Sequence, residues 1–365
     1  MAVAALSACG GGAPENKAAD VVGPEEKVLH VFNWADYIGK NTVADFEAKT
    51  GIKVTYDTYD SNEVLETKLL TGHTDYDIVV PTLTFAERLI KAGVFRKLDK
   101  SKLPNLSNMD TEIMRRVAVS DPGNEYSINY MWGTTGIGYN PRMVRKALGT
   151  DRIESWSALF EPKIASKLAK CGITLLDAPE DVFDSVRIYQ GHDPNSEKME
   201  ELAEAEALLM KVRPYIRYFS SSQHVNDLAS GEICVSLSWS GLILQARSRG
   251  AATATPVEIA YAIPSEGADI WFDMMAIPAD APHPDNAHVF INFLMDAKVI
   301  AGVSNDVGYA NGNAASLPLV NSELRDDPLV YPPDEVRKRL FTPVAHSPEF
   351  SREQNRAWTR VKTGQ

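Results

Sequence analysis

The sequence predicts an α/β protein built from two lobes. Strand-like apolar runs alternate with helical segments of about ten residues, which is typical of a mainly parallel sheet. The chain has 365 residues, and single hydrophobic cores stop growing at about 250–300 residues. The segment 130–139 is a strand-like run interrupted by Gly133, Gly136 and Gly138. It predicts a crossover between lobes, where small residues permit hinge rotation, although these glycines could instead mark a bulge.

The elements follow in two series. We expect strands at 28–32, 52–56 and 77–80, alternating with helices at 43–49, 63–70 and 85–92. Gly51 and Gly93 stand where glycine commonly ends a helix. The second series has expected strands at 173–176, 216–219 and 233–239, and helices at 181–189, 197–211, 224–229 and 242–249. Return strands at 258–263 and 270–277 and a helix at 286–295 complete the pattern. The expected lobes are 27–136 with 268–317, and 137–267 with 318–365.

Residues 1–26 predict an export signal followed by a tether. Leu6-Ser7-Ala8-Cys9 resembles a bacterial lipobox, in which the cysteine becomes lipidated. A complete signal has a basic start and about 7–15 apolar residues, and both parts are short here. We interpret 1–26 as a truncated lipoprotein signal and flexible tether. The alternative is an Ala/Gly tail with an incidental cysteine.

Two further cysteines, Cys171 and Cys234, lie in strand-like runs. In an exported protein they predict a disulfide, which would close a loop of about sixty residues and contribute roughly 3–4 kcal/mol. Two buried thiols are the alternative.

Composition and motifs exclude several functions. The net charge of −12 argues against nucleic acid and suits either a cationic ligand or simple solubility. The apolar runs are shorter than the roughly 20 residues that cross a membrane. The sequence has neither a dinucleotide-binding nor a P-loop glycine pattern, no nucleophile elbow and no histidine spacing typical of metal sites. We therefore expect no cofactor, no metal and no enzyme activity. A glycosidase using paired carboxylates is the alternative from another class.

The loop after the first expected strand contains Trp34, Asp36 and Tyr37. Open α/β sheets hold ligands beyond the carboxyl ends of their strands, and a carboxylate between aromatic rings suits an organic cation. The alternative is a loop whose rings cover the core and whose Asp36 accepts backbone amides. Other strand exits add rings, hydroxyls and carboxylates but no lysine or arginine, which argues against an anion site. These residues are Thr82, Thr84, Asp177, Glu180, Ser221, Trp239, Trp271, Asp273 and Tyr309.

Asp273 interrupts a strongly apolar run. A buried, unpaired carboxylate costs several kcal/mol, so Asp273 needs a cationic ligand, a ring of donors or a salt bridge within the protein. Two other candidates have structural alternatives. Thr84 could cap a helix together with Glu87, and Asp177 could cap a helix that begins at Pro179.

Several segments together resemble the polyamine-binding periplasmic receptors of bacterial ABC importers, of the putrescine and spermidine type. The most specific segments are 33–38, 77–81, 176–180, 217–223, 234–241, 272–273, 309–313 and 331–334. The resemblance implies the two-lobed periplasmic binding protein fold (type II), with the ligand in the cleft between lobes. It also implies a periplasmic monomer that delivers a polyamine to a membrane permease. Together with the lipobox, it predicts that the protein is held at the membrane only by a lipid on Cys9.

The resemblance also implies roles for the candidates. Five rings would sandwich the methylene chain: Trp34, Tyr37, Trp239, Trp271 and Tyr309. Asp36, Glu180 and Asp273 would bind amino groups, while Thr82 and Ser221 would add hydrogen bonds. The family carries a disulfide at positions matching Cys171 and Cys234.

Departures from the family concern the ligand. Leu242 replaces an acid of the putrescine receptors, and Ala35 replaces a hydroxyl residue of both kinds. Trp271 stands where putrescine receptors have phenylalanine, and Asp177 matches an acid of the spermidine receptors. These changes predict tighter binding of spermidine than of putrescine. A putrescine-preferring receptor of the same type is the alternative.

Overall fold

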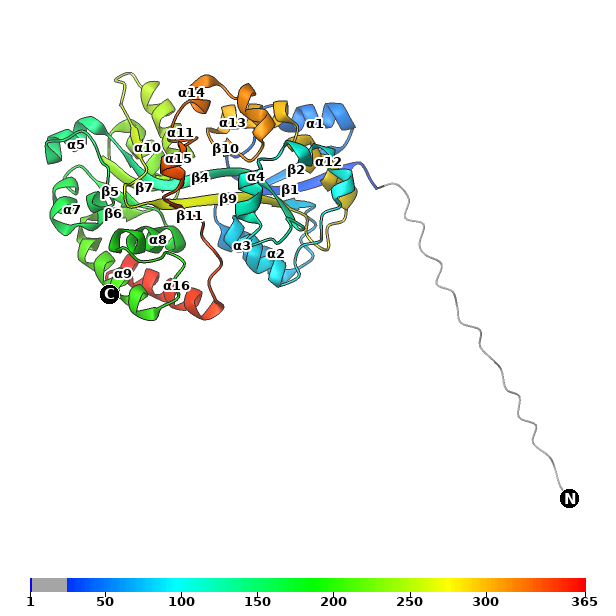
Figure 1. Ribbon diagram of the computed structural model, residues 1–365, viewed down its shortest axis with the longest axis horizontal. Helices are drawn as coiled ribbons and strands as arrows, with labels where there is room; N and C mark the ends of the chain where they lie inside the picture. The colour runs from blue at the N-terminus through cyan, green and yellow to red at the C-terminus, as the bar shows by residue number, and fades with distance from the viewer. Residues whose placement is uncertain (2–24) are drawn as a thin grey trace.

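The computed structural model describes Met1 and residues 25–365, and it is organised around a mixed sheet (Figure 1). The main strand order is β2-β1-β3-β9-β4-β7-β5-β6, with β8, β10 and β11 pairing to its sides. The strands are β1 (Val28–Trp34), β2 (Lys53–Tyr59), β3 (Ile78–Val79), β4 (Ser127–Tyr139), β5 (Ile173–Leu175), β6 (Ile216–Phe219), β7 (Val235–Trp239), β8 (Ala260–Ala262), β9 (Ala268–Ala276), β10 (Ala310–Asn311) and β11 (Leu340–Phe341).

The helices fall into three groups along the chain. Those between β1 and β4 are α1 (Thr42–Thr50), α2 (Asn62–Thr71), α3 (Leu83–Lys91) and α4 (Thr111–Val117). Those between β4 and β9 are α5 (Pro141–Leu148), α6 (Ser157–Phe160), α7 (Pro162–Leu168), α8 (Pro179–Gln190), α9 (Met199–Val212), α10 (His224–Ser230) and α11 (Ser240–Ala251). After β9 come α12 (Pro284–Leu294), α13 (Ala297–Val307), α14 (Ser322–Arg325), α15 (Asp334–Arg337) and α16 (Pro348–Thr363). Short 3₁₀ turns are η1 (Lys100–Lys102), η2 (Pro104–Asn108), η3 (Arg213–Tyr215) and η4 (Ala314–Leu319).

Two long strands join the two halves of the molecule. β4 and β9 are antiparallel neighbours and cross the middle of the view in Figure 1. The start of β4 also pairs with β10, whereas its end pairs with β7 and β8. The first lobe contains β1–β3 and the second contains β5–β7, which confirms the two-lobed α/β fold. The chain boundaries given above for each lobe remain a prediction.

The glycines of β4 allow close packing at the junction. A Cβ on Gly138 would lie 2.2 Å from Cδ1 of Ile243, and one on Gly133 would lie 2.5 Å from the Trp271 ring. The register of β4 shifts elsewhere, between Asn129 and Met131. β4 therefore crosses between the lobes as predicted, and a bulge does not explain these glycines. Hinge rotation at these glycines stays a prediction.

Local signals placed most helix ends. α8 begins at Pro179, two residues before the expected helix at 181–189 and at the residue named in the alternative interpretation of Asp177. Gly51 follows α1 with a φ of 72° in the left-handed region. The capping interpretation of Thr84 is wrong, because Thr84 lies inside α3 and the residue preceding that helix is Thr82. Asp177 does not cap α8 either: Ala178 precedes the helix and makes no side-chain cap.

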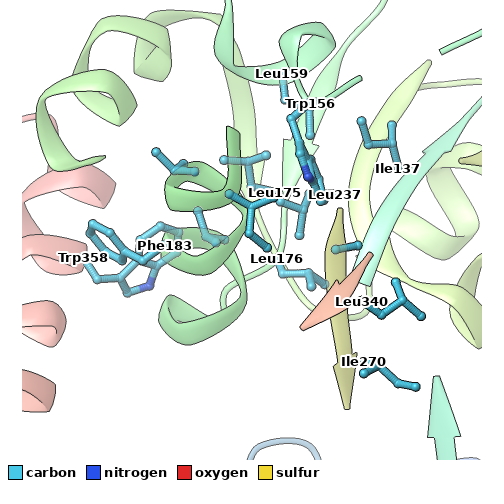
Figure 2. Packing of buried hydrophobic residues seen from close by; sticks show 14 of the residues in the cluster. Ile137, Trp156, Leu159, Leu175, Leu176, Phe183, Leu237, Ile270, Leu340 and Trp358 are labelled. Carbon is cyan, nitrogen blue, oxygen red and sulfur yellow. The ribbon is translucent and has the colours of Figure 1, made fainter. Parts of the chain in front are cut away.

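The second lobe has its core between the sheet and helices α6–α9 and α16. Figure 2 shows Trp156 and Leu159 packed beside Leu175 and Leu237, with Trp358 of α16 against Phe183 on the other side. The ring centroids of Trp358 and Phe183 are 6.4 Å apart. The C-terminal helix therefore forms part of the second lobe.

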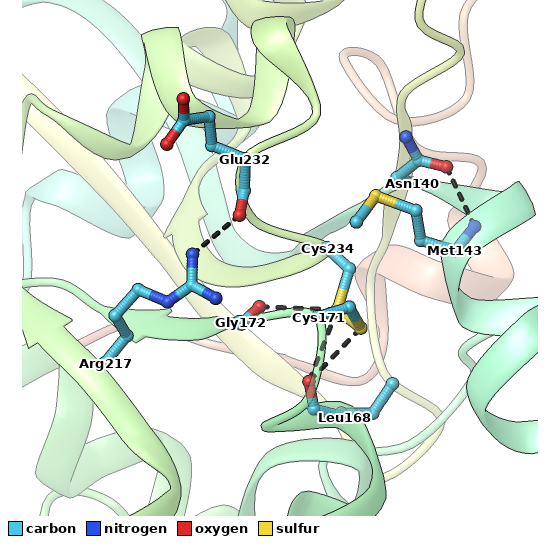
Figure 3. The surroundings of a disulfide bond; sticks show 8 residues. All are labelled: Asn140, Met143, Leu168, Cys171, Gly172, Arg217, Glu232 and Cys234. Atoms are coloured by element: carbon cyan, nitrogen blue, oxygen red, sulfur yellow. Dashed lines mark hydrogen bonds between the residues drawn. A yellow bond between two sulfur atoms is a disulfide. The ribbon is translucent and has the colours of Figure 1, made fainter.

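Cys171 and Cys234 form a disulfide with a Cα–Cα distance of 5.4 Å (Figure 3). The predicted disulfide is confirmed, and the alternative of two buried thiols is wrong. The bridge ties the chain before β5 to the chain before β7. Gly172 has a φ of +100° and lies under the guanidinium of Arg217, where a Cβ would be 2.7 Å from Cζ. Arg217 itself donates a hydrogen bond to the Glu232 carbonyl at 2.6 Å.

Within residues 25–365, no single helix combines the length and apolarity needed to span a membrane; only the bent pair α12 and α13 does so when taken together. Cys9, the predicted lipidation site, lies outside the described residues.

Candidate functional site

A cavity of about 760 Å³ lies where the two lobes meet. Its wall includes every residue that the sequence proposed for the ligand site: Trp34, Ala35, Asp36, Tyr37, Thr82, Thr84, Asp177, Glu180, Ser221, Trp239, Leu242, Trp271, Asp273 and Tyr309. They come from the exits of β1, β3, β5, β6 and β7, from β9 and from the turn after α13. The expectation that ligand-binding residues follow the ends of strands therefore identified residues that line one cavity although they are up to 275 positions apart in the sequence.

The loop after β1 is held by contacts to other segments. The Trp34 indole donates to the Val80 carbonyl at 2.9 Å, and the Ala35 amide donates to the Tyr59 carbonyl at 3.0 Å. Asp36 is exposed and has a φ of 54°, a left-handed conformation that aspartate tolerates better than most residues. The loop therefore presents the Asp36 carboxylate at the mouth of the cavity.

Asp273 is the most deeply buried acid of the site. It is 5% exposed, and its two oxygens accept hydrogen bonds from the Tyr37 and Thr82 hydroxyls, each at 2.8 Å. Burial raises the pKa of the Asp273 carboxyl to about 7, against the opposing effect of these two donors. No ion pair among the described residues involves Asp273. The salt-bridge alternative is therefore wrong, and a ring of neutral donors surrounds this carboxyl.

Aromatic rings form the walls beside Asp273. The centroids of Trp34 and Trp239 are 6.5 Å apart, and Tyr309 lies 5.2 Å from Tyr37 and 5.5 Å from Trp271. Tyr309 also packs directly on Gly241, where a Cβ would come within 2.1 Å of its ring. Gly241 is the second residue of the second-lobe helix α11, so this contact joins the two lobes.

The other two predicted acids on the second-lobe side already have cations. Glu180 accepts from Arg88 and from Thr84, both at 3.2 Å, across the cleft. Burial raises the pKa of the Glu180 carboxyl, and Arg88 acts in the opposite direction. Asp177 accepts from Lys362 at 2.8 Å and from the Trp358 indole at 2.8 Å.

The sequence argument missed several acids of the wall. Asp181 lies on α8 next to Glu180, and Asp60 and Glu63 follow β2. The strand-exit rule applied to 52–56 would have found Asp60 and Glu63. Asp181 lies in the first turn of α8, where an acid also suits the helix dipole, so its position in the sequence carries no specific signal for a ligand.

The charge of the wall is strongly one-sided. Seven carboxylates line the cavity and one guanidinium, that of Arg249, accompanies them. Carboxylates beside aromatic faces suit an organic cation with an apolar body. A cavity of this kind between two lobes that share two strands defines a cleft-type solute-binding protein.

Comparison with known proteins places the chain in a family. Residues 41–332 match the model of the bacterial extracellular solute-binding proteins, and the chain belongs to this family. It is 49% identical to the putrescine-binding periplasmic protein of Escherichia coli (strain K12), over 93% of this chain and 92% of that one. It is 34% identical to the spermidine/putrescine-binding periplasmic protein of the same organism, over 86% of each chain. Among solved structures, a putative spermidine/putrescine ABC transporter from Listeria monocytogenes superposes with a TM-score of 0.83 at 30% identity, over 93% of this chain and 100% of that chain. The chain is thus a solute-binding protein and not an enzyme.

Proposed function

We propose that this protein is the substrate-binding receptor of an ABC importer and that its ligand is a linear polyamine. The ligand chain would lie between the rings of Trp34, Trp239 and Trp271, and its ammonium groups would meet the carboxylates of the wall. The single observation that carries the proposal is Asp273, a buried acid whose contacts are all neutral donors. Such a group gains most when a cation enters the cavity, because its charge is otherwise uncompensated.

The preferred ligand is proposed to be putrescine. The relative at 49% identity is named for putrescine alone, whereas the spermidine/putrescine relative is 34% identical. One sequence argument for spermidine rested on Asp177, but this acid is already paired with Lys362. The predicted preference for spermidine therefore has little support.

Two lobes joined by strands can open and close on a ligand. Contacts across the cleft that favour the closed arrangement are the Arg88–Glu180 ion pair and the packing of Tyr309 on Gly241. A polyamine that touches both walls would shift the population toward this arrangement. A membrane permease would then recognise the closed form.

The proposed location is the periplasm, as the names of the relatives indicate for them. Lipid attachment at Cys9 and the monomeric state remain predictions from the sequence. Labelling of Cys9 by a fatty acid analogue in cells, with Cys9→Ser as the control, tests the anchor.

Calorimetric titration with putrescine, cadaverine, agmatine, spermidine and spermine tests the function. We expect micromolar or tighter binding of at least one linear polyamine, with putrescine the tightest. Absence of binding to all five would refute the polyamine proposal. Tighter binding of spermidine would refute the ranking alone and restore the sequence prediction.

A further inference from the structure

The acids of the cavity differ in whether the protein already supplies them with a cation. Asp177 is paired with Lys362 and Glu180 with Arg88. Asp273 and Asp181 have no such partner among the ion pairs of the described residues, although both line the cavity. Asp36, Asp60 and Glu63 are exposed, so water can compensate their charge, whereas Asp181 is only partly exposed and Asp273 is buried.

Asp181 is held by two neutral donors in the same way as Asp273. Its Oδ1 accepts from the Thr135 hydroxyl at 2.7 Å and from the Trp239 indole at 2.8 Å. Thr135 is part of the crossing strand β4, and Trp239 ends β7. Both side-chain hydrogen bonds end on the same oxygen, which leaves Oδ2 as an acceptor for a ligand.

The position of Asp181 complements that of Asp273. Asp273 lies on β9 with its donors on the first-lobe side of the cavity, whereas Asp181 lies at the start of α8 in the second lobe. Trp34 lies beside the first-lobe wall, and its ring centroid is 6.5 Å from that of Trp239. Trp239 is the residue whose indole donates to Asp181. The cavity therefore has one uncompensated carboxylate on each side of an aromatic passage.

We propose that Asp181 is the second-lobe receptor for an ammonium group, so that a diamine is held with one end at Asp273 and the other at Asp181. This inference rests on the proposed polyamine function and names the residue that fixes the second end. Asp181 supplies its carboxylate to the cavity from the first turn of α8.

The test compares two ligands that differ by one ammonium group, putrescine and 1-aminobutane. Wild type, Asp181→Asn and the control Glu232→Gln, which neutralises an exposed second-lobe acid outside the cavity, are titrated at pH 8, with tryptophan fluorescence as the readout because three tryptophans line the cavity. We expect Asp181→Asn to weaken putrescine binding by about 30-fold or more, the loss typical of truncating one partner of a charge pair that the ligand buries. Binding of 1-aminobutane by Asp181→Asn, and putrescine binding by Glu232→Gln, should stay within about twofold of wild type.

Thermal unfolding of the ligand-free variants shows whether they fold, and Asp181→Ser replaces Asp181→Asn if the latter does not. A putrescine affinity that changes less than twofold in the folded variant overturns the inference. An equal loss for putrescine and 1-aminobutane also overturns it, because Asp181 would then shape the cavity without meeting the second ammonium. If wild type binds putrescine but Asp181→Asn does not lose putrescine affinity selectively over 1-aminobutane affinity, the inference about Asp181 is wrong and the proposed polyamine function still holds. If wild type binds no polyamine, the proposed function fails first.

Discussion

Replacing Asp273 by asparagine is the most informative change to the site. The side chain keeps its size and one acceptor oxygen, but it loses its negative charge. Asp273 is 5% exposed, and its carboxylate accepts hydrogen bonds from the Tyr37 and Thr82 hydroxyls. Removing one partner of a buried, hydrogen-bonded charge pair costs about 2–4 kcal/mol of binding free energy, or roughly 30- to 900-fold in Kd. Calorimetry with putrescine at pH 8 measures this loss. A change below about twofold would show that Asp273 serves the fold and not the ligand.

Asp273→Asn weakens ligand binding, but it should stabilise the ligand-free protein relative to wild type as the pH rises. Burial raises the pKa of Asp273 to about 7, above an unfolded value of about 3.9. The folded state therefore binds a proton more tightly, and the stability that this provides is lost as the pH rises from about 4 to about 7. Asparagine cannot ionise. The difference in unfolding free energy, variant minus wild type, should thus rise between pH 4 and pH 8 by up to about 4 kcal/mol. A difference that does not change with pH would refute the assignment.

Three further outcomes are expected. An ammonium binds the ionised form of Asp273, so putrescine affinity should be constant above about pH 8 and fall by up to tenfold per pH unit below pH 7. Calorimetry in buffers of different ionisation enthalpy should detect the release of a proton on binding. A putrescine affinity that does not change with pH would contradict this. Gly241→Ala places a Cβ against the Tyr309 ring, so polyamine affinity should fall by about 5- to 150-fold, the effect of 1–3 kcal/mol of overpacking; unchanged affinity would show that the closed contact is dispensable. The double change Cys171→Ser with Cys234→Ser should lower the unfolding free energy by about 4 kcal/mol for a bridge spanning 63 residues, measured by urea denaturation, while putrescine affinity stays at the wild-type value.

The larger elements could be predicted because their periodicity is local. The expected strand at 216–219 matches β6, and the expected helix at 224–229 matches α10 to within one residue. The two-residue strands β10 and β11 are too short for any period, and they exist only because a long strand offers them a free edge. Short helices such as α4, α5, α6 and α7 were also missed, since none of them is much longer than two turns. Helix α13 was missed as well, although it has 11 residues.

The membership of the cavity could be predicted, but the state of its acids could not. The position of an acid after a strand is visible in the sequence. Whether the protein supplies a cation depends on distant segments: Lys362 reaches Asp177 from 185 positions away, and Arg88 reaches Glu180 from 92 positions away. The ligand argument built on Asp177 was weakened for this reason.

The two crossing strands also bear on the order in which the chain folds. The first lobe pairs Val79 of β3 with Ala276 of β9, and β4 pairs with β9 along much of its length. The sheet of the first lobe therefore stays incomplete until a segment that follows the whole second series has joined it. Pairings over such sequence distances slow folding, because loop closure precedes any gain from the contact. Neither half is a continuous piece of chain, so a fragment ending at 136 would lack the central strand of its own sheet and would not fold alone.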